Sequence, residues 1–435
     1  MNRTWTNWSK LQRATPSRVE TPWTTSQLQR VVNEAIAQHR QVKAIGAGHS
    51  FTGIAVANDI QVDLSHYTGV VEFDPVAQHI TLRAGTRLWQ IPHLLADTSL
   101  ALQNLGDIDQ QSIAGAISTS THGTGLCFGG LASQVVGIEL LTGTGEVVTA
   151  SAGDSPDLLD ALRVTLGAFG IITTVTLQLV PEYDLHTVEA HTQLDWVLEH
   201  WDVLNTTHDH FELFWFGHDT EVMTKTSQRR PVSYRKPTVS HRLRRRLIDD
   251  YATNAALAAI CQMGRAKPAW VPHLNRLATV GWGSSRRTAH WSTAFASARR
   301  VRFKEMEYAL PYDVIPEVVS ELQLLYRRGD LSSTYPLEIR TAAPDTAWFA
   351  SNHGRKTGYI AVHQHFSQDY RDYFARVEPI FRAAGGRPHW GKIHSLTSTE
   401  LAPLYPHWEH MMQLRERFDP NRMFANEYLT RVLGP

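Results

Sequence analysis

The chain has 435 residues, 42% of them hydrophobic, which is enough for two or three domains with a sizeable core. Lysine and arginine together number 42, as do aspartate and glutamate, so the formal charge is zero and no overall basic field is available to gather nucleic acid. The composition therefore argues against a nucleic-acid partner and favours a small-molecule one.

Cysteine content and hydropathy indicate the compartment. The two cysteines, Cys127 and Cys261, are too few for a disulfide framework, which fits a reducing compartment. The first ten residues lack an apolar signal-peptide core, and no run of eighteen apolar residues occurs in the chain. We expect a cytoplasmic enzyme whose contact with a membrane is at most peripheral.

The first third of the chain predicts alternating helices and strands with short links. Thr24 and Gln27 have capping-box spacing and begin a predicted helix that runs to about His39. Predicted strands cover residues 42–45, 60–64 and 80–84, and another helix begins at about residue 88.

Residues 106–130 have a different composition, being rich in glycine, serine and threonine. Such a segment offers backbone N–H groups and hydroxyls, which are the groups that hold a pyrophosphate. Its apolar residues, including Ile108, Ile113 and Ile117, argue against a disordered linker.

The remaining pattern predicts the domain boundaries. A hairpin is expected over residues 135–150 with its turn at 142–145, then a helix over 158–166 and an alternating strand over 174–179. A basic run at 242–247 is interpreted as a solvated helix face rather than a docking patch for an acidic partner. The predicted parts are a first domain over 1–181, a second over 182–385, and a C-terminal segment over 386–435 that returns to the first domain.

A histidine lies in the glycine turn at residues 46–52, GAGHSFT. A Rossmann fingerprint is unlike this turn because Phe51 occupies the position of its last glycine. A hydrolase nucleophile elbow centred on Ser50 departs from its pattern only at the last glycine, which Thr52 replaces, so Ser50 stays a candidate nucleophile. A histidine that merely caps the turn is the remaining ordinary interpretation of His49.

Three short motifs near the C-terminus carry further polar chemistry. Glu338 and Arg340 are two residues apart and share one face if the segment is a strand, as do His363 and His365. Residues 389–392, HWGK, add an imidazole, an indole and an ammonium group. Zinc is a rival interpretation of the histidines, although the sequence has no H-E-x-x-H motif.

Taken in order, the glycine turn with its histidine, the segment SIAGAISTSTHGTG, the E-I-R strand and the H-W-G-K motif resemble a known family. The family is that of the aldonolactone oxidoreductases, within the vanillyl-alcohol-oxidase flavoproteins. The resemblance covers nearly the whole chain, from Asn7 to its end. It is greatest to bacterial L-gulono-1,4-lactone dehydrogenases and D-arabinono-1,4-lactone oxidases, and weaker to alditol oxidases.

The resemblance implies the cofactor FAD, attached covalently through His49. In this family the histidine of G-x-G-H-S is joined to the 8α-methyl group of FAD, and a neutral imidazole is a competent nucleophile near neutral pH. The cofactor-binding residues that the resemblance implies are Gly46, Ala47, Gly48, His49, Ser50, Phe51, Gly106, Asp107, Ser112, Gly115, Ala116, Ile117, Ser118, Ile171 and His389.

The resemblance also implies the catalytic groups. These are Glu338, Arg340, His363 and Lys392, and the same four residues are expected to bind substrate together with Asp107 and His365. No metal is expected.

His365 and Asp107 stand where alditol oxidases have threonine and serine, which argues against an open-chain polyol. Gly106 is the residue found in relatives that use oxygen, so the expected acceptor is oxygen or a redox protein.

The function that these residues imply is oxidation of a carbinol carbon of a sugar-derived 1,4-lactone by hydride transfer to the flavin N5. The proton acceptor is Glu338 or His363, with or without Lys392. An alditol oxidase is the alternative within the superfamily; a serine hydrolase at Ser50 and a non-catalytic sugar-binding protein are alternatives outside it. The implied fold is α+β, with a bipartite FAD-binding domain and a cap domain whose antiparallel sheet is flanked by helices.

Overall fold

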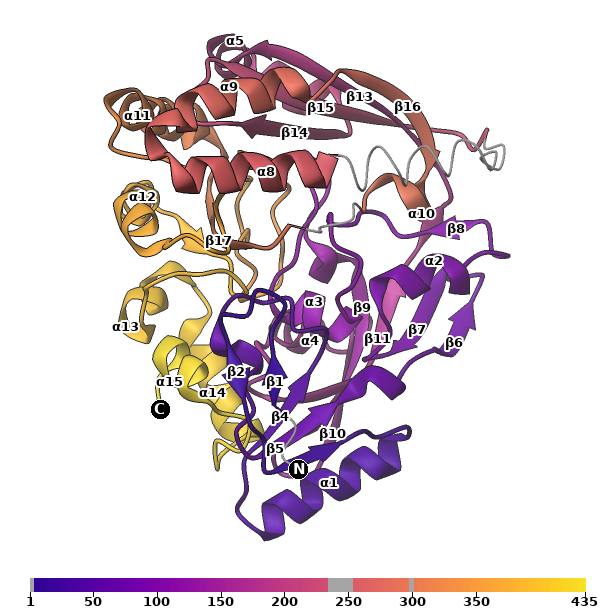
Figure 1. Cartoon of the computed structure of the whole chain (residues 1–435). Helices are drawn as coiled ribbons and strands as arrows, with labels where there is room; N and C mark the ends of the chain where they lie inside the picture. Colours follow the sequence, from indigo (N-terminus) through magenta and orange to yellow (C-terminus); the bar gives the residue numbers. More distant parts are fainter. Residues whose placement is uncertain (1–3, 234–252, 297–300) are drawn as a thin grey trace.

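The protein is described by a computed structural model that covers residues 4–233, 253–296 and 301–435. Figure 1 shows an N-terminal part that contains β-sheets and helices, a cap that begins at β13, and a C-terminal part whose helices lie beside the N-terminal part. The basic run at 242–247 lies outside the described residues. None of the described helices is long and apolar enough to cross a membrane.

The N-terminal part begins with a small parallel sheet in the order β3-β5-β4. Helix α1, Thr25–Ala37, begins where the sequence predicts, because the Thr24 side chain accepts a hydrogen bond from the Gln27 amide. Its apolar stripe, which includes Leu28 and Val32, is buried. The strands are β3 (Arg18–Glu20), β4 (Val42–Ile45) and β5 (Ile60–Asp63).

A second, antiparallel sheet has the order β10-β9-β11-β7-β6. The predicted hairpin at 135–150 forms β9 and β10, with its turn between them. The bounds are β6 (Val70–Asp74), β7 (His79–Arg83), β9 (Val135–Thr142), β10 (Val147–Ser151) and β11 (Gly170–Gln178). Two short pairings complete this part: β1 (Trp5–Thr6) with β2 (Arg13–Ala14), and β8 (Leu100–Ala101) with β12 (Val180–Pro181).

Two local predictions in this part are wrong in detail. The helix expected from residue 88 is only a 3-10 turn, Leu88–Gln90, followed by α2, Ile91–Leu94. The helix expected over 158–166 is α4, Pro156–Leu162, and Leu166, which the prediction included, adopts a left-handed φ of 57° in the turn that follows. The glycine-rich segment contains a six-residue helix, α3, Ile113–Ser118, which Ser112 caps.

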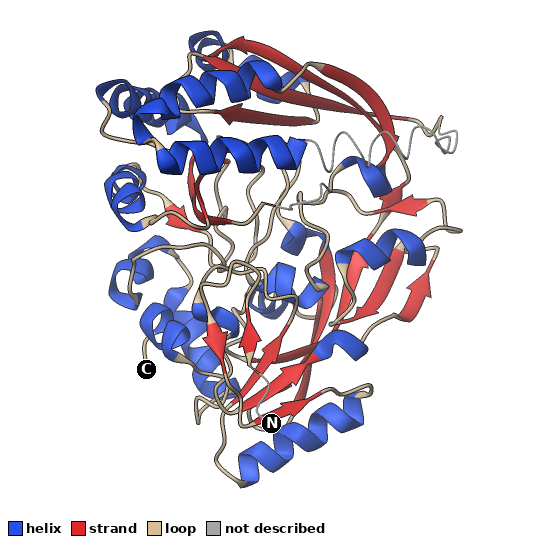
Figure 2. Ribbon diagram, in the orientation of Figure 1, coloured by secondary structure: helices blue, strands red, loops and turns tan. Residues whose placement is uncertain are grey.

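The cap is built on an antiparallel sheet in the order β16-β13-β15-β14-β18-β19-β17-β20, and Figure 2 shows helices packed around it. Its strands are β13 (Asp184–Gln193), β14 (His210–Trp215), β15 (Glu221–Arg230), β16 (Ser285–His290), β17 (Phe303–Pro311), β18 (Leu337–Ala342), β19 (Thr357–His365) and β20 (Arg387–Pro388). Its helices are α5 (Leu194–Glu199), α6 (Trp201–Thr207), α8 (Thr253–Ala266), α9 (Val271–Gly281), α10 (Trp291–Ala294), α11 (Ile315–Arg328) and α12 (Arg371–Ala383).

The C-terminal segment contacts both other parts. Strand β20 pairs with β17 of the cap sheet. Farther along, Asn426 Nδ2 donates to the carbonyl oxygens of Gly53, Ile54 and Val56, next to the glycine turn. The helices of this segment are α13 (Ser398–Leu401), α14 (Trp408–Phe418) and α15 (Glu427–Leu433). The α+β class is confirmed, with antiparallel sheets in both the N-terminal part and the cap.

Candidate active site

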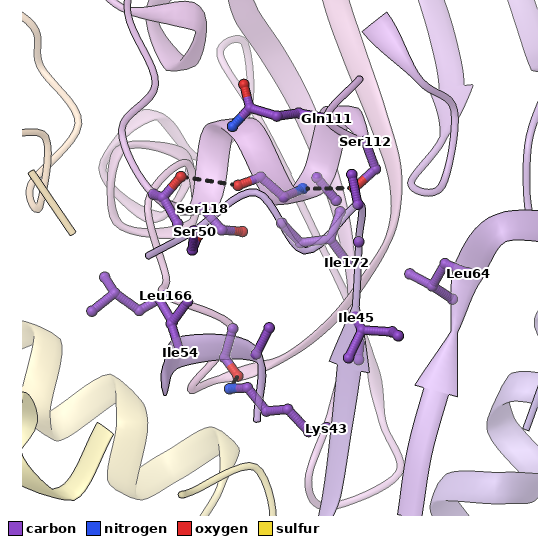
Figure 3. Close-up of a pocket in the computed structure, with 18 of the residues that line it drawn as sticks. Lys43, Ile45, Ser50, Ile54, Leu64, Gln111, Ser112, Ser118, Leu166 and Ile172 are labelled. Atoms are coloured by element: carbon purple, nitrogen blue, oxygen red, sulfur yellow. Dashed lines mark hydrogen bonds between the residues drawn. The ribbon is translucent and has the colours of Figure 1, made fainter. Parts of the chain in front are cut away.

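A pocket opens between strand β4, the helix α3 and the turn that precedes β11 (Figure 3). Figure 3 shows Gln111 and Ser112 at one end of the pocket and Lys43 at the other. Nine of the residues that the resemblance assigned to the cofactor line it: Gly46, Ala47, Gly48, His49, Ser50, Ser112, Gly115, Ser118 and Ile171.

The backbone of the glycine turn, residues 46–52, lies close to Ser112 and takes a conformation that favours glycine. A Cβ atom at Gly46 would lie 2.6 Å from Ser112 Oγ, and Gly48 has a left-handed φ of 69° that glycine adopts without strain. Among the described residues, the structure records no hydrogen bond from the amides of Ala47, Gly48, His49 or Ser50. Consecutive free amides form an anion-binding nest, so the turn fits a pyrophosphate group.

His49 lines this pocket and is neutral at physiological pH. Burial, together with the positive charges of Arg87 and Lys392, lowers the pKa of its imidazole to about 4. Its ring stacks on the indole of Trp8, with 5.8 Å between ring centroids. A neutral imidazole keeps a nitrogen lone pair, and that lone pair is the requirement for forming a covalent bond to a cofactor.

Lys43 is buried at the other end of the pocket. Its ammonium group donates to the carbonyl oxygens of Gly167 at 2.8 Å and Phe424 at 3.2 Å. Burial lowers the pKa of Lys43 to about 7. The lysine therefore joins the pocket wall to the C-terminal segment while giving up its proton more readily than in the unfolded chain.

Lys43 makes stability depend on pH in a defined direction. Between about pH 7 and the ordinary lysine pKa near 10.5, the unfolded chain holds a proton that the folded chain has lost, so the free energy of unfolding rises with pH. We expect Lys43→Met to remove this rise. Denaturant midpoints at about pH 7 and about pH 9 should increase for the parent but not for the variant. Equal increases in both proteins would contradict the assignment.

The glycine turn is joined to the C-terminal HWGK motif. The Phe51 amide donates to the Gly391 carbonyl at 2.7 Å, and the Lys392 ammonium lies 5.2 Å from the centre of the Phe51 ring. Phe51 itself is buried against Phe303 of β17, outside the pocket lining. The two motifs, more than three hundred residues apart in the sequence, therefore meet at the edge of the cap sheet.

Arg340 is the centre of a buried ion cluster on the cap sheet. Its guanidinium pairs with Glu338 on the same strand and with Asp107 from the N-terminal part, and Glu212 of β14 lies 3.9 Å away. Burial alone would lower the pKa of Arg340, but Asp107 and Glu338 hold it well above its ordinary value. The predicted Glu338–Arg340 pair is thus present, and Asp107 connects it to the N-terminal part.

Two atoms of this cluster are buried without a hydrogen-bond partner: Arg340 Nε and Glu212 Oε2. Buried polar atoms are nearly always satisfied, so this donor and this acceptor are available to a polar ligand or to an ordered water. Lys225 of β15 holds Glu212 through its other oxygen at 3.0 Å. Neither Glu212 nor Lys225 was predicted from the sequence.

Strand β17 supplies two more carboxylates that the sequence analysis missed, Glu305 and Glu307. They are two residues apart and therefore share a face. Glu305 pairs with Lys392, and His363 Nε2 lies 3.5 Å from it. Burial raises the pKa of Glu305, but Lys392 and His363 outweigh burial and bring it to about 2. The period-two spacing of glutamates in KEMEYALP was the signal that could have identified them.

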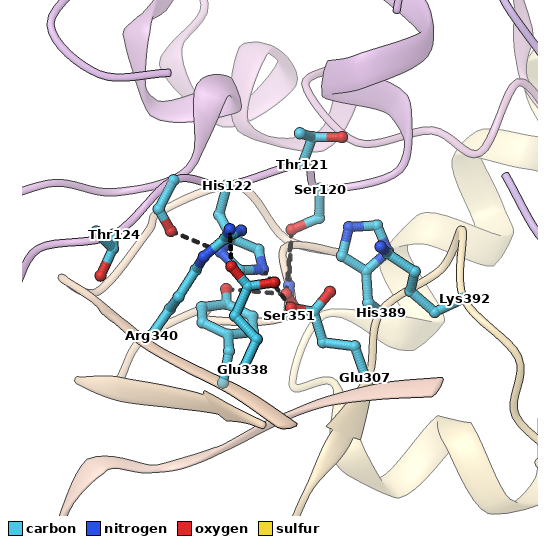
Figure 4. A network of polar contacts seen from close by, with 12 residues as sticks. Ser120, Thr121, His122, Thr124, Glu307, Glu338, Arg340, Ser351, His389 and Lys392 are labelled. Atoms are coloured by element: carbon cyan, nitrogen blue, oxygen red, sulfur yellow. Dashed lines mark hydrogen bonds and ion pairs between the residues drawn. The ribbon is translucent and has the colours of Figure 1, made fainter. Parts of the chain in front are cut away.

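Glu307 lies beside two histidines. His122 Nε2 is 3.3 Å from its carboxylate, and a nitrogen of His389 lies within 4.8 Å of both groups. Figure 4 shows His122 coming from the N-terminal part and Glu307, Glu338 and Arg340 from the cap strands, with His389 and Lys392 on the C-terminal segment. Burial lowers the pKa of His389 to about 3, so this ring is neutral.

The other predicted residues lie as follows. His365 Nδ1 contacts Ser367 Oγ at 2.8 Å, at the end of β19. Ala116 and Ile117 are fully buried within α3 and face the core rather than the pocket. A Cβ atom at Gly106 would lie 2.9 Å from the His122 carbonyl oxygen, so an alanine there would press against the segment that carries His122.

The geometry does not support a hydrolase at Ser50. Among the described residues, no histidine donates to or accepts from its hydroxyl, and the nearby His389 uses Nδ1 to accept from the Gly391 amide at 3.0 Å. A serine nucleophile needs an imidazole within hydrogen-bond reach.

Comparison with known proteins agrees with this site. Residues 175–432 match the family described as D-arabinono-1,4-lactone oxidase, and residues 16–151 match the FAD binding domain. The chain is also 39% identical over 435 residues to L-gulono-1,4-lactone dehydrogenase of Mycobacterium tuberculosis, covering 100% of both chains.

The chain belongs to the D-arabinono-1,4-lactone oxidase family. It is an FAD-dependent oxidoreductase of the aldonolactone oxidase and dehydrogenase group. L-gulonolactone oxidase of Mus musculus is 28% identical over 435 residues, covering 98% of this chain and 97% of its own.

Among solved structures, cholesterol oxidase from B. sterolicum has a TM-score of 0.81 at 16% identity, covering 100% of this chain and 97% of its own. That likeness shows the fold alone.

Proposed function

We propose that the protein oxidises a carbinol carbon of a sugar-derived 1,4-lactone, using FAD bound in the glycine-turn pocket and joined covalently to His49. The observation that carries the proposal is the junction of two sites. A pocket whose glycine turn fits a pyrophosphate, and which contains a neutral histidine, is connected through Phe51, Lys392 and Glu305 to the cap sheet, and that sheet carries the buried Arg340 cluster with its unsatisfied donor and acceptor.

The pocket residues would hold the cofactor by its phosphates and rings. The free amides of the turn and the hydroxyls of Ser112 and Ser118 would surround the dinucleotide, and His49 Nε2 or Nδ1 would carry the covalent bond. FAD, when bound, supplies the acceptor for the substrate hydride.

Arg340 and its carboxylates are suited to bind hydroxyl groups of a sugar lactone. Arg340 Nε can donate to a substrate oxygen and Glu212 Oε2 can accept from a hydroxyl, because neither atom has a hydrogen-bond partner among the described residues. The guanidinium also places fixed positive charge where negative charge develops during the reaction.

Glu338 is the preferred proton acceptor. His363 Nδ1 donates to the Pro336 carbonyl at 2.9 Å and its Nε2 faces Glu305, so both of its ring nitrogens are already engaged. Glu338 pairs with Arg340 through Oε1 and lies on the same face as the unsatisfied atoms, and a carboxylate held beside the substrate site can accept a proton from a hydroxyl.

A substrate panel tests the proposal. Purified protein mixed without oxygen with aldono-1,4-lactones, the corresponding open-chain aldonates and alditols is expected to lose its flavin absorbance with the lactones. Addition of oxygen or of an artificial acceptor then identifies the acceptor. Bleaching by alditols but not by lactones would overturn the proposed substrate class, and a colourless native preparation would overturn the flavin assignment.

A further inference from the structure

His122 lies at the junction of the N-terminal part and the cap, in a buried position. Its ring stacks on Tyr359 of β19, with 3.4 Å between ring centroids and 13° between planes. The ring of His389 is 5.9 Å away, and Glu307 of β17 faces Nε2. Neither His122 nor Glu307 has a role among the family residues identified from the sequence.

The hydrogen bonds of His122 determine where its protons are. Its Nδ1 lies 2.8 Å from the Gly123 carbonyl oxygen, which can only accept, so Nδ1 carries a proton. Its Nε2 faces a carboxylate oxygen of Glu307 at 3.3 Å. A bare nitrogen lone pair against a carboxylate would be repulsive, so this contact needs a proton too. His122 beside an ionised Glu307 is therefore an imidazolium.

A second pair on the same strand has the same arrangement. His363 donates from Nδ1 to the Pro336 carbonyl and presents Nε2 to Glu305 at 3.5 Å. The register of β17 and β19 places Glu305 directly opposite His363. Two histidines from separate elements thus each place one nitrogen on a backbone carbonyl and the other on a β17 carboxylate.

Glu305 and Glu307 are both buried, and a buried charge without a counter-charge is costly. Lys392 pairs with Glu305, whereas the nitrogen that faces Glu307 at 3.3 Å is His122 Nε2.

We propose that His122 is a positioning residue of the flavin site whose imidazolium charge offsets Glu307, so that the site remains favourable to the negative charge gained when the cofactor is reduced. The inference rests on the proposed function only in that the cofactor ring must lie against the Arg340 face. Three groups bear directly on His122: Glu307 of β17, the Tyr359 ring of β19 and His389 of the C-terminal segment.

The test measures the two-electron midpoint potential of the bound flavin against reference dyes in His122→Gln, Glu307→Gln and the double variant. His122→Gln keeps an amide donor but loses the charge, so Glu307 is left unbalanced and the potential should fall. Glu307→Gln should raise it. We expect each single change to shift the reduction equilibrium at least tenfold, which is about 30 mV for a two-electron couple. The double variant should return close to the parent.

This pattern is not expected from a merely structural role. Damage to packing would lower the potential or stability in both single variants and add in the double variant, whereas charge compensation gives opposite signs and a cancellation. An unchanged potential in His122→Gln, or a double variant that behaves like His122→Gln alone, would overturn the proposal. If His122→Gln does not fold, Glu307→Gln still tests the proposal, because a potential that does not rise in this variant would overturn it.

The matched control is Tyr359→Phe, which keeps the ring under His122 and removes a hydroxyl that contacts Ser351. Its potential should equal that of the parent. The titration needs no lactone, so a failed substrate panel leaves this test intact. A midpoint potential that is unchanged in both His122→Gln and Glu307→Gln would overturn this inference and leave the lactone assignment intact.

Discussion

Arg340→Ala is expected to lose nearly all turnover while the protein still binds FAD. The substitution removes the cation that pairs with Asp107 and Glu338, together with the buried Nε donor that we assign to substrate. Loss of one preorganised donor at a site of developing charge reduces kcat by roughly a hundred- to a thousand-fold. Anaerobic stopped-flow measurement of flavin bleaching by a lactone gives the rate.

The same change is expected to destabilise the fold, because three carboxylates lose their shared cation. Removal of one partner from a buried ion pair costs about 3–5 kcal/mol. Arg340→Lys is the matched control: it keeps the charge, so stability should largely return, but a lysine cannot reproduce the forked geometry, and turnover should stay low. Full turnover in Arg340→Ala with normal flavin content would refute the role of Arg340.

His49→Ala is expected to abolish covalent flavin. The residue lines the glycine-turn pocket and is neutral, and it is the nucleophile that the family resemblance assigns to the 8α-methyl group. After acid precipitation the yellow colour should appear entirely in the supernatant of the variant, and in the pellet of the parent. Fluorescence of the denatured chain on a gel gives the same comparison independently.

Ser50→Ala serves as the control for His49→Ala, because it changes the next residue in the same turn without touching the imidazole. It should keep covalent flavin and measurable oxidation of the lactone. Covalent flavin that survives His49→Ala would place the attachment elsewhere. Activity that disappears only in Ser50→Ala would revive the hydrolase interpretation.

Elements with strong local signals were predictable. The Thr24 cap and the apolar stripe of α1 were identified from spacing alone, as were the strands β4 and β5 and the hairpin of β9 and β10. The end of α4 was not, because the prediction included Leu166, whose left-handed φ of 57° does not fit a helix. Helix α3 was missed because six residues give too short a window for helical periodicity.

The motif residues of the site were identified in the sequence, but the groups that balance their charge were not. Glu212, Lys225 and Glu305 lie on strands whose only local signals are alternation and β propensity. His122 belongs to the segment SIAGAISTSTHGTG, yet nothing in the spacing of that segment indicated a partner on β17. Pairings across strands depend on sheet order, which single-sequence patterns do not encode.

The sequence by itself determined the short-range structure, the zero net charge and, through four ordered motifs, the family resemblance and its cofactor. Only the tertiary structure decided that Asp107 reaches Arg340, that Lys392 and His363 share Glu305, and that His122 faces Glu307. The physical reason is the distance along the sequence over which each interaction acts. Periodicity and capping involve residues a few positions apart, whereas ion pairs in a buried site require strands and loops from distant segments to be held together at hydrogen-bond distance.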